Sequence, residues 1–162
     1  MLDRTGIPSR TQVLSVFLHE DELVNYKAVI ECYEQIPCNP CESHCPFDAI
    51  HIGENLNNRP NLISEKCVGC GICVGVCPGL AIMLAKVSST KATFTIAYEF
   101  NPKPSVQDVW HAIDRSGNIL GDATILKVVE SLKLDHTALI TVQTDRKFLH
   151  DFITIRSKNH ES

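Results

Sequence analysis

Residues 67–78 read Cys67-Val68-Gly69-Cys70-Gly71-Ile72-Cys73-Val74-Gly75-Val76-Cys77-Pro78, a C-x2-C-x2-C-x3-C-P run. This is the ligand spacing of two-cluster iron–sulfur proteins, in which three closely spaced thiolates bind one cluster and the fourth binds its neighbour. The run therefore predicts a second group of ligands elsewhere in the chain. Just upstream lie Cys38, Cys41 and Cys45 as C-x2-C-x3-C-P, with Cys32 before them.

The two cysteine segments form an internal repeat. Both contain C-P-x-x-A-I, at residues 45–50 and 77–82, and a fixed offset of this kind indicates two copies of one supersecondary unit. We expect the last cysteine of each copy to open a short helical turn, with proline at its first position. Over residues 28–86 this arrangement resembles the two-[4Fe–4S] bacterial ferredoxin family.

Other uses of eight cysteines fit the sequence less well. All eight lie between residues 32 and 77, and the polar opening Met1–Arg10 predicts no secretory signal. A reduced, cytoplasmic setting is therefore expected, where clustered cysteines bind metal rather than form disulfides. Structural zinc favours paired C-x2-C units separated by a longer stretch. The closely spaced C-x2-C-x2-C-x3-C-P run predicts two [4Fe–4S] clusters. A zinc-stabilised interaction module is the less favoured alternative.

Three glycines, Gly69, Gly71 and Gly75, stand between the ligands of the downstream segment. Glycine adopts positive φ without steric cost, so it allows a backbone to fold closely around an inorganic core. Backbone N–H groups can then donate hydrogen bonds to sulfur, which tunes a cluster's potential. We expect these glycines to form the backbone around cluster one.

In this ligand pattern the last cysteine of each segment binds the cluster of the other segment, and this rule divides the cysteines between the two clusters. Cluster one is predicted to use Cys67, Cys70, Cys73 and Cys45, and cluster two to use Cys38, Cys41 and Cys77. Counting back from Cys45 places the remaining ligand at Gln35, which is not a usual iron ligand. Cys32 lies three residues earlier and could reach cluster two if residues 33–37 loop out. The alternatives are a three-iron cluster or a buried, unligated Cys32.

Composition and patterning divide the chain into four parts: an N-terminal arm (1–27) with a short helix near 11–18, a dicluster ferredoxin domain (28–86), a small β-rich domain (87–156) and a tail (157–162). The fold class expected is α+β, a ferredoxin-like dicluster domain followed by a barrel-like β domain. Turn residues 114–118 predict a hairpin, and Gly121 a bulge. Strands are expected at 28–31, 50–52, 61–63, 93–100, 106–113, 119–129, 136–144 and 153–156, and a short helix at 145–152.

The remaining features exclude several functions. The formal net charge is −4, which argues against nucleic-acid binding, and no apolar run could span a bilayer. No nucleotide-binding or hydrolytic motif is present. His111, His136 and His150 are isolated and expected to be structural, and Trp110 is expected in a core. His44 and His51 lie near cysteines, and they either tune a cluster or face solvent.

The run Ile30–Cys41, the opening Arg4–Pro8 and the turn Asp114–Gly117 resemble a narrower family: small iron–sulfur subunits of flavin-dependent amino-acid or imino-acid dehydrogenases, of the proline or hydroxyproline type. That resemblance implies a non-catalytic subunit that carries single electrons between flavin centres. It also implies flavoprotein partners, a hetero-oligomer and Cys32 as a ligand. Residues 87–156 would then contact the partner. A free-standing ferredoxin serving other oxidoreductases is the alternative.

Overall fold

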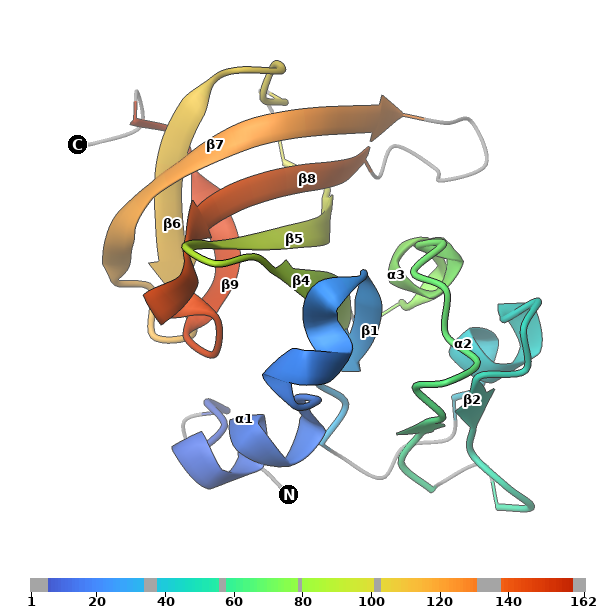
Figure 1. Ribbon diagram of the computed structural model, residues 1–162. Helices are drawn as coiled ribbons and strands as arrows, with labels where there is room; N and C mark the ends of the chain where they lie inside the picture. Colours follow the sequence, from blue (N-terminus) through green and yellow to red (C-terminus); the bar gives the residue numbers. More distant parts are fainter. Residues whose placement is uncertain are drawn as a thin grey trace.

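One open antiparallel sheet of seven strands, in the order β1-β4-β5-β8-β7-β6-β9, dominates the computed structural model (Figure 1). The structure describes residues 6–33, 38–55, 58–78, 80–100, 103–130 and 138–158. His136 and Gln35 lie outside these ranges, as do Arg4 and Thr5. The strands are β1 (Lys27–Ile30), β4 (Ile82–Val87), β5 (Lys91–Tyr98), β6 (Val109–Asp114), β7 (Ile119–Glu130), β8 (Ala138–Asp145) and β9 (Phe152–Arg156).

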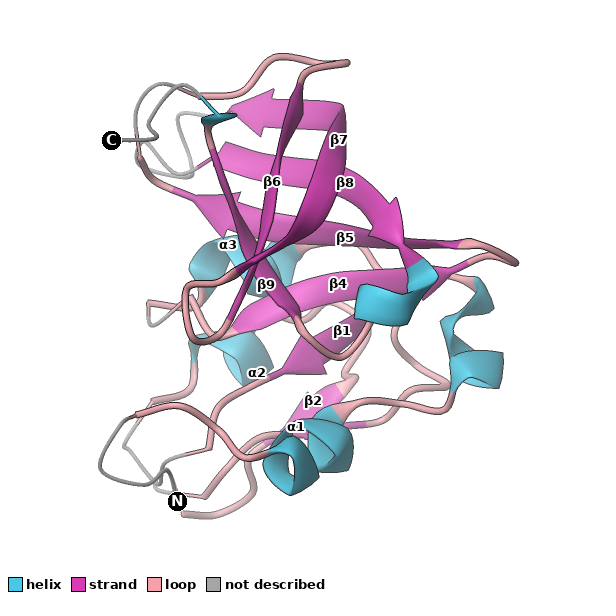
Figure 2. Ribbon diagram, turned by 90° about the vertical axis from the view of Figure 1, so that its left-hand side faces the viewer, coloured by secondary structure: helices cyan, strands magenta, loops and turns pink. Residues whose placement is uncertain are grey.

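The other elements are short, and in Figure 2 helices lie on both sides of the sheet and below it. None of the helices in the described ranges has the length and apolarity needed to cross a membrane. The elements are the helices α1 (Arg10–Val16), α2 (Pro40–His44) and α3 (Ile72–Val76), the 3₁₀ helices η1 (Glu20–Val24) and η3 (Arg146–Phe148), and the two-stranded sheet of β2 (Ile50–His51) and β3 (Asn61–Leu62).

Most strands predicted from alternation are present, with ends shifted by a few residues. Strand β4 was not predicted, because Ile82–Ala85 is a continuous apolar run without alternation, as expected of a strand buried on both faces. The helix predicted at 145–152 is wrong in extent, since only η3 forms before the chain enters β9. A bulge lies next to the predicted position: Ala112 opposes Gly121 and Ile113 opposes Ile119, so Leu120 rather than Gly121 is the extra residue.

The sheet curls but does not close into the barrel-like form that was expected. Among the described strands, the edges β1 and β9 each pair with one neighbour, and not with each other. The concave face buries the aromatic pair Phe94 and Phe152, whose rings stack at 4.3 Å. Trp110 is buried in the same core, as predicted. The curled sheet thus supplies a core of its own.

Strands β1 and β4 serve two cores at once. Val29 and Met83 oppose each other and point into the core of the curled sheet. Ala28, Ile30 and Leu84 point to the opposite face, into a second core that contains cysteines. The predicted boundary between residues 86 and 87 falls within β4, and the pairing of β4 with β5 makes the sheet continuous across it.

The N-terminal arm packs against the curled sheet. Helix α1 begins with a capping box in which Ser9 and Gln12 satisfy each other's backbone N–H groups. Leu23 of η1 is fully buried in the core of the curled sheet. An ion pair between Arg10 and Asp151, at 2.6 Å, adds a surface contact. The arm therefore covers one side of the sheet next to β1 (Figure 1).

Candidate metal centres

Cysteines from both halves of the repeat line one cavity, here called site one. Its empty volume is about 330 Å³, open mouth included. Cys67 and Cys73 are buried, Cys45 is half-buried and Cys70 is exposed. The rest of the lining is apolar or backbone, with Ile50 and Leu84 among the walls. Site one thus contains the four cysteines predicted for cluster one.

The other four cysteines, Cys32, Cys38, Cys41 and Cys77, line a second cavity, site two. Its empty volume is about 380 Å³, and its walls include Ile30 and Ile82. Cys41 is buried, and the other three are half-buried. The chain thus brings Cys32 to the group predicted for cluster two, although four of the residues between Cys32 and Cys38 lie outside the described ranges. The assignment of ligands to clusters stays a prediction.

The two sites stand side by side on one strand pair. Ala28 opposes Leu84 across β1 and β4, and both line site one. Two residues further along, Ile30 opposes Ile82, and both line site two. Because successive same-face positions on a strand are two residues apart, β1 and β4 set the spacing of the two sites.

The repeat C-P-x-x-A has a shared geometry that corrects one prediction. Cys45 and Cys77 do not open helices. They are the C-caps of α2 and α3, and a turn follows each of them. The fourth residue of each copy, Asp48 or Leu80, has φ near +54° or +53°. This turn points the next N–H back at the cysteine: Ala49 donates to Cys45 Sγ and Ala81 to Cys77 Sγ, each at 3.4 Å.

Two of the three glycines have the predicted positive φ, Gly69 at +72° and Gly71 at +85°. Gly75 lies inside helix α3 and does not have a positive φ. Gly69 also lies close to the backbone of Tyr26, which leaves no room for a side chain. The spacing of the cysteines gave no sign of this contact, because Tyr26 is far upstream.

Burial and the closeness of other cysteines disfavour the thiolate form in both sites unless a cation is present. Burial, and then the neighbouring Cys67, Cys70 and Cys45, raise the pKa of Cys73 to about 12. Burial and the nearby Cys77, Cys38 and Cys32 raise the pKa of Cys41 to about 11. Four thiolates in one apolar cavity need cations among them, and iron supplies this positive charge. The donor set of each site therefore fits an iron–sulfur cluster.

The four cysteines of each site line a cavity rather than converge on the position of a single metal ion. Nowhere in the described ranges do three or more His, Cys, Asp or Glu side chains converge as ligands of a single metal ion would. A structural zinc site needs its four sulfurs about 2.3 Å from one ion. Four cysteines around a cavity instead match a cluster that binds each thiolate through a different iron.

Polar groups around the sites are few. Lys27 donates from Nζ to the carbonyls of Ser64 (2.8 Å) and Cys67 (2.6 Å), and this places a cation at the edge of site one. Ala28 N–H donates to Cys67 Sγ at 3.4 Å. His44 is exposed, and its Nδ1 lies 2.9 Å from the Pro40 carbonyl. His51 lies beside Asp48 and is partly exposed.

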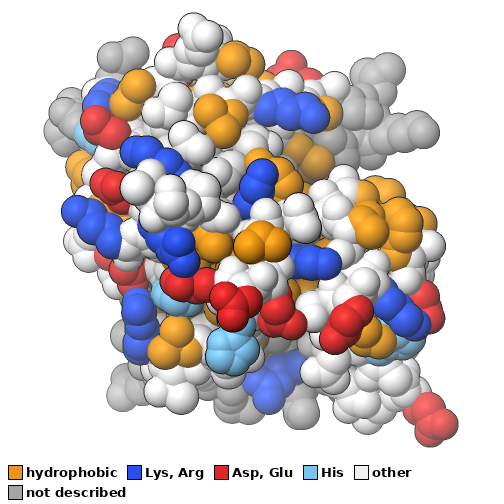
Figure 3. Space-filling view, in the orientation of Figure 1, with side chains coloured by type: hydrophobic (Ala, Val, Ile, Leu, Met, Phe, Trp, Pro, Cys, Tyr) orange, Lys and Arg blue, Asp and Glu red, His pale blue; other side chains and the backbone are white. Residues whose placement is uncertain are grey.

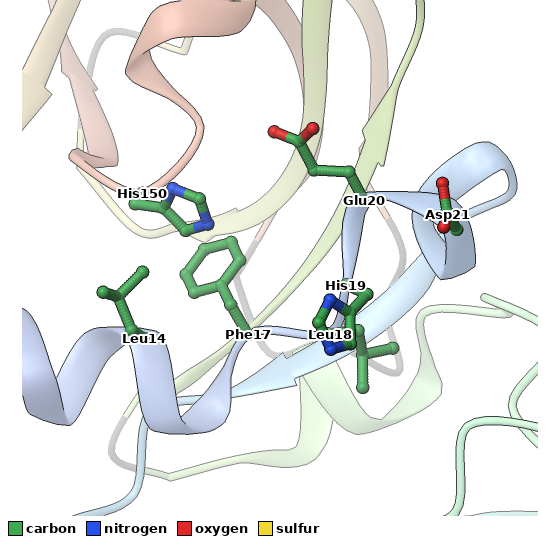
Figure 4. A pocket seen from close by; sticks show the side chains of 7 residues that line it. All are labelled: Leu14, Phe17, Leu18, His19, Glu20, Asp21 and His150. Atoms are coloured by element: carbon green, nitrogen blue, oxygen red, sulfur yellow. The ribbon is translucent and has the colours of Figure 1, made fainter.

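A further cavity lies between the N-terminal arm and the η3–β9 turn, away from the cysteines (Figure 4). Its empty volume is about 850 Å³, open mouth included. The His150 ring meets Phe17 edge-on at 4.8 Å, and Glu20 binds Arg146 at 2.7 Å. Burial lowers the pKa of His150. His150 is thus held by packing, as expected of a structural histidine. The lining residues are Leu14, Phe17, Leu18, His19, Glu20, Asp21 and His150.

Comparison with known proteins agrees with this geometry. Residues 36–81 match the 4Fe–4S dicluster domain family. Over 72 residues the chain is 39% identical to a ferredoxin of Pyrobaculum islandicum, a match that covers 44% of this chain and 65% of that protein. No solved structure matches the chain significantly.

Two other relatives are named as components of oxidoreductase complexes. Over 49 residues the chain is 45% identical to one component of the ion-translocating oxidoreductase complex of Methanosarcina acetivorans, covering 30% of this chain and 17% of that protein. Over 38 residues it is 53% identical to one component of the Na(+)-translocating ferredoxin:NAD(+) oxidoreductase complex of Acetobacterium woodii, covering 24% and 11%. The chain therefore spans under two thirds of each of these relatives.

Residues 36–81 are thus a 4Fe–4S dicluster segment, which indicates two [4Fe–4S] clusters. This match favours iron–sulfur clusters over a zinc module or a disulfide framework. The comparisons carry no match to the subunits of amino-acid or imino-acid dehydrogenases, so that narrower resemblance remains a proposal.

Proposed function

We propose that this chain is a non-catalytic electron-transfer subunit of an oxidoreductase complex, with Cys45, Cys67, Cys70 and Cys73 holding cluster one and Cys32, Cys38, Cys41 and Cys77 holding cluster two. When bound, each cluster accepts and releases single electrons. The observation that carries the proposal is the placement of two four-cysteine sites side by side on β1 and β4. The walls of both sites are largely apolar.

The surface near Cys70 is suited to contact a redox partner. Cys70 is the one exposed thiol among the eight. Near it, Phe47, Val68 and Ile72 line the same site and are 44%, 57% and 41% exposed. In Figure 3, hydrophobic side chains gather on the right of the molecule, the side that carries α2 and α3 in Figure 1. A partner docked there would bring its own redox centre close to site one.

The curled sheet offers a second contact area, as proposed for residues 87–156. Phe94, Tyr98 and Trp110 are core residues, so they do not form this surface. Val106, Val109 and Leu126 are more than two fifths exposed. They lie close together, because Gln107 donates its N–H to the Ile125 carbonyl and Val109 opposes Thr124. We call these three residues the β6–β7 patch.

The finer part of the proposal is a flavin-dependent amino-acid or imino-acid dehydrogenase as the partner. Native purification under anaerobic conditions tests it: the expected result is co-elution with a subunit that contains flavin. Val109→Lys combined with Leu126→Lys should weaken co-elution while leaving both clusters intact. Val24→Lys, at a 60% exposed site on the arm, is the matched control. Unchanged co-elution of the double variant would exclude the β6–β7 patch.

A free-standing ferredoxin is the second candidate, supported by the similarity to the ferredoxin of Pyrobaculum islandicum. It predicts a chain that purifies alone and reduces or oxidises several unrelated enzymes. In either case we expect about eight iron and eight sulfide per chain. Turnover of an amino acid by the isolated, flavin-free chain would contradict both candidates.

A further inference from the structure

The segment around Cys32 is held by an arginine that is 84 residues away from Glu31 in the sequence. Arg115, in the turn between β6 and β7, donates from Nε to Glu31 Oε1 at 2.8 Å, and its Nη2 binds the same oxygen. The two side chains are only 10% and 7% exposed. Arg115 Nη1 also donates to the His150 carbonyl at 2.6 Å. The guanidinium therefore joins three segments that are distant in sequence.

The residues on both sides of Cys32 belong to this network. Tyr33 is buried and donates its O–H to Glu31 Oε1 at 3.1 Å. Glu31 and Tyr33 thus direct their side chains to the same place, while Cys32 between them lines site two. The Glu31 N–H donates to the Ala81 carbonyl at 2.7 Å, and the Ala81 N–H donates to Cys77 Sγ. The contacts of Glu31 reach the cysteines of site two from two directions.

The turn that carries Arg115 is itself rigid. The Asp114 carboxylate accepts from the N–H groups of Ser116 (2.9 Å) and Asn118 (2.8 Å). Gly117 takes φ +87°, which closes the turn. Strand β6 is paired on both sides, by β7 and by β9. The guanidinium is therefore presented from a fixed point in the curled sheet.

We infer that Arg115 is a positioning residue for cluster two: by binding Glu31 it holds the segment 31–33 so that Cys32 faces site two. In the upstream cysteine segment, the position where the spacing predicts a ligand is occupied by Gln35, which is not a usual iron ligand. The curled sheet supplies the missing constraint through a buried guanidinium, whose Nε and Nη2 both donate to Glu31 Oε1. This inference rests on the proposed role of Cys32 as a ligand.

The test follows each cluster separately in the full, anaerobically purified chain. The variants are Arg115→Met, Arg115→Lys and Cys32→Ser, with Arg146→Met as a control that loses the partly exposed ion pair between η3 and η1. The readouts are iron release to a chelator, and the three-iron EPR signal after oxidation. In Arg115→Met, iron release from cluster two should be about 10-fold faster, because outer partners of metal ligands contribute about this much.

Cluster one serves as the internal reference: loss of the buried pair lowers the stability of the whole sheet, so in Arg115→Met its release rate should rise clearly less than that of cluster two. Arg115→Lys keeps the positive charge but not the planar set of guanidinium N–H donors. Its iron release from cluster two should therefore be faster than in the parent and slower than in Arg115→Met. Arg146→Met should behave as the parent. Cys32→Ser should give a three-iron signal from cluster two alone. This pattern supports the inference and separates positioning from a general loss of stability.

Other outcomes overturn it. If Cys32→Ser gives the three-iron signal but Arg115→Met matches the parent, Cys32 is a ligand and Arg115 does not position it. If Arg115→Met loses both clusters equally, its role is only structural. If Cys32→Ser keeps both clusters unchanged, the ligand proposal fails and the inference with it. Should Arg115→Met yield no folded chain, the cluster-two rate of Arg115→Lys decides, and a rate equal to the parent's overturns the inference.

Discussion

Gly69 lies against the backbone of Tyr26. A Cβ on Gly69 would stand 2.5 Å from the Tyr26 carbonyl oxygen and 2.6 Å from the Tyr26 Cβ. Tyr26 precedes β1, which forms the floor of both sites, and Gly69 lies between two cysteines of site one. This contact therefore joins the cysteine loop to the sheet, and only glycine allows it.

Gly69→Ala is expected to destabilise site one more than Gly71→Ala. Both positions have positive φ, so alanine costs about 1–2 kcal/mol at either. At Gly71 the nearest atoms to an added Cβ are side-chain methyls at 3.7 and 3.8 Å, which is ordinary contact. The difference between the variants isolates the clash with Tyr26, of about 1–3 kcal/mol. Thermal loss of the visible cluster absorbance measures it, and equal loss in the two variants would contradict the contact.

Cys70→Ser should remove cluster one and leave cluster two. Losing a ligand removes binding energy that is also folding energy, so the melting temperature should fall as well. The iron content should drop from about eight to about four per chain, measured together with the EPR spectrum of the reduced protein. Cys32→Ser is the paired variant, expected to affect only cluster two. If Cys70→Ser retained both clusters with unchanged melting, the assignment of site one would be wrong.

Lys27→Met should lower the reduction potential of cluster one. The ammonium lies at the edge of site one, where it donates to the Ser64 and Cys67 carbonyls. Removing a positive charge disfavours the more negative, reduced state, by on the order of 1 kcal/mol, or tens of millivolts for one electron. Redox titration monitored by EPR measures the shift. Lys27→Arg keeps the charge and is the control, and a potential that rises in Lys27→Met would refute this account.

Removing one partner of the buried Glu31–Arg115 pair should cost far more stability than removing one of the exposed Arg10–Asp151 pair. A buried charge left alone costs about 3–5 kcal/mol, whereas an exposed pair contributes about 0–1 kcal/mol. Arg115→Met and Arg10→Met can be compared by denaturant unfolding, followed by circular dichroism. Combining Arg115→Met with Glu31→Gln should recover part of the loss, because no unpaired charge then remains. Equal effects of Arg115→Met and Arg10→Met would contradict the burial of the pair.

Short sequence patterns predicted those strands and turns that depend mainly on neighbouring residues. The strands expected at residues 93–100 and 119–129 match β5 and β7, whose ends differ by one or two residues. Asp114 and Gly117 marked the hairpin turn, since a capping carboxylate and a positive φ are properties of single residues. Strand β4 was missed, because burial on both of its faces removes the alternation that would reveal it.

The sequence by itself determined the chemistry. The spacing of Cys67, Cys70, Cys73 and Cys77 specifies iron–sulfur ligation, because the reach of a thiolate from a tight loop depends on neighbouring residues only. The tertiary structure alone decided how Cys32 joins site two, what lies beneath the sites, and that the dicluster segment and the curled sheet share strands. Those features depend on contacts such as Glu31–Arg115 and Ala28–Leu84, between residues far apart in the chain. No local pattern encodes such contacts, because they form only when the whole sheet has folded.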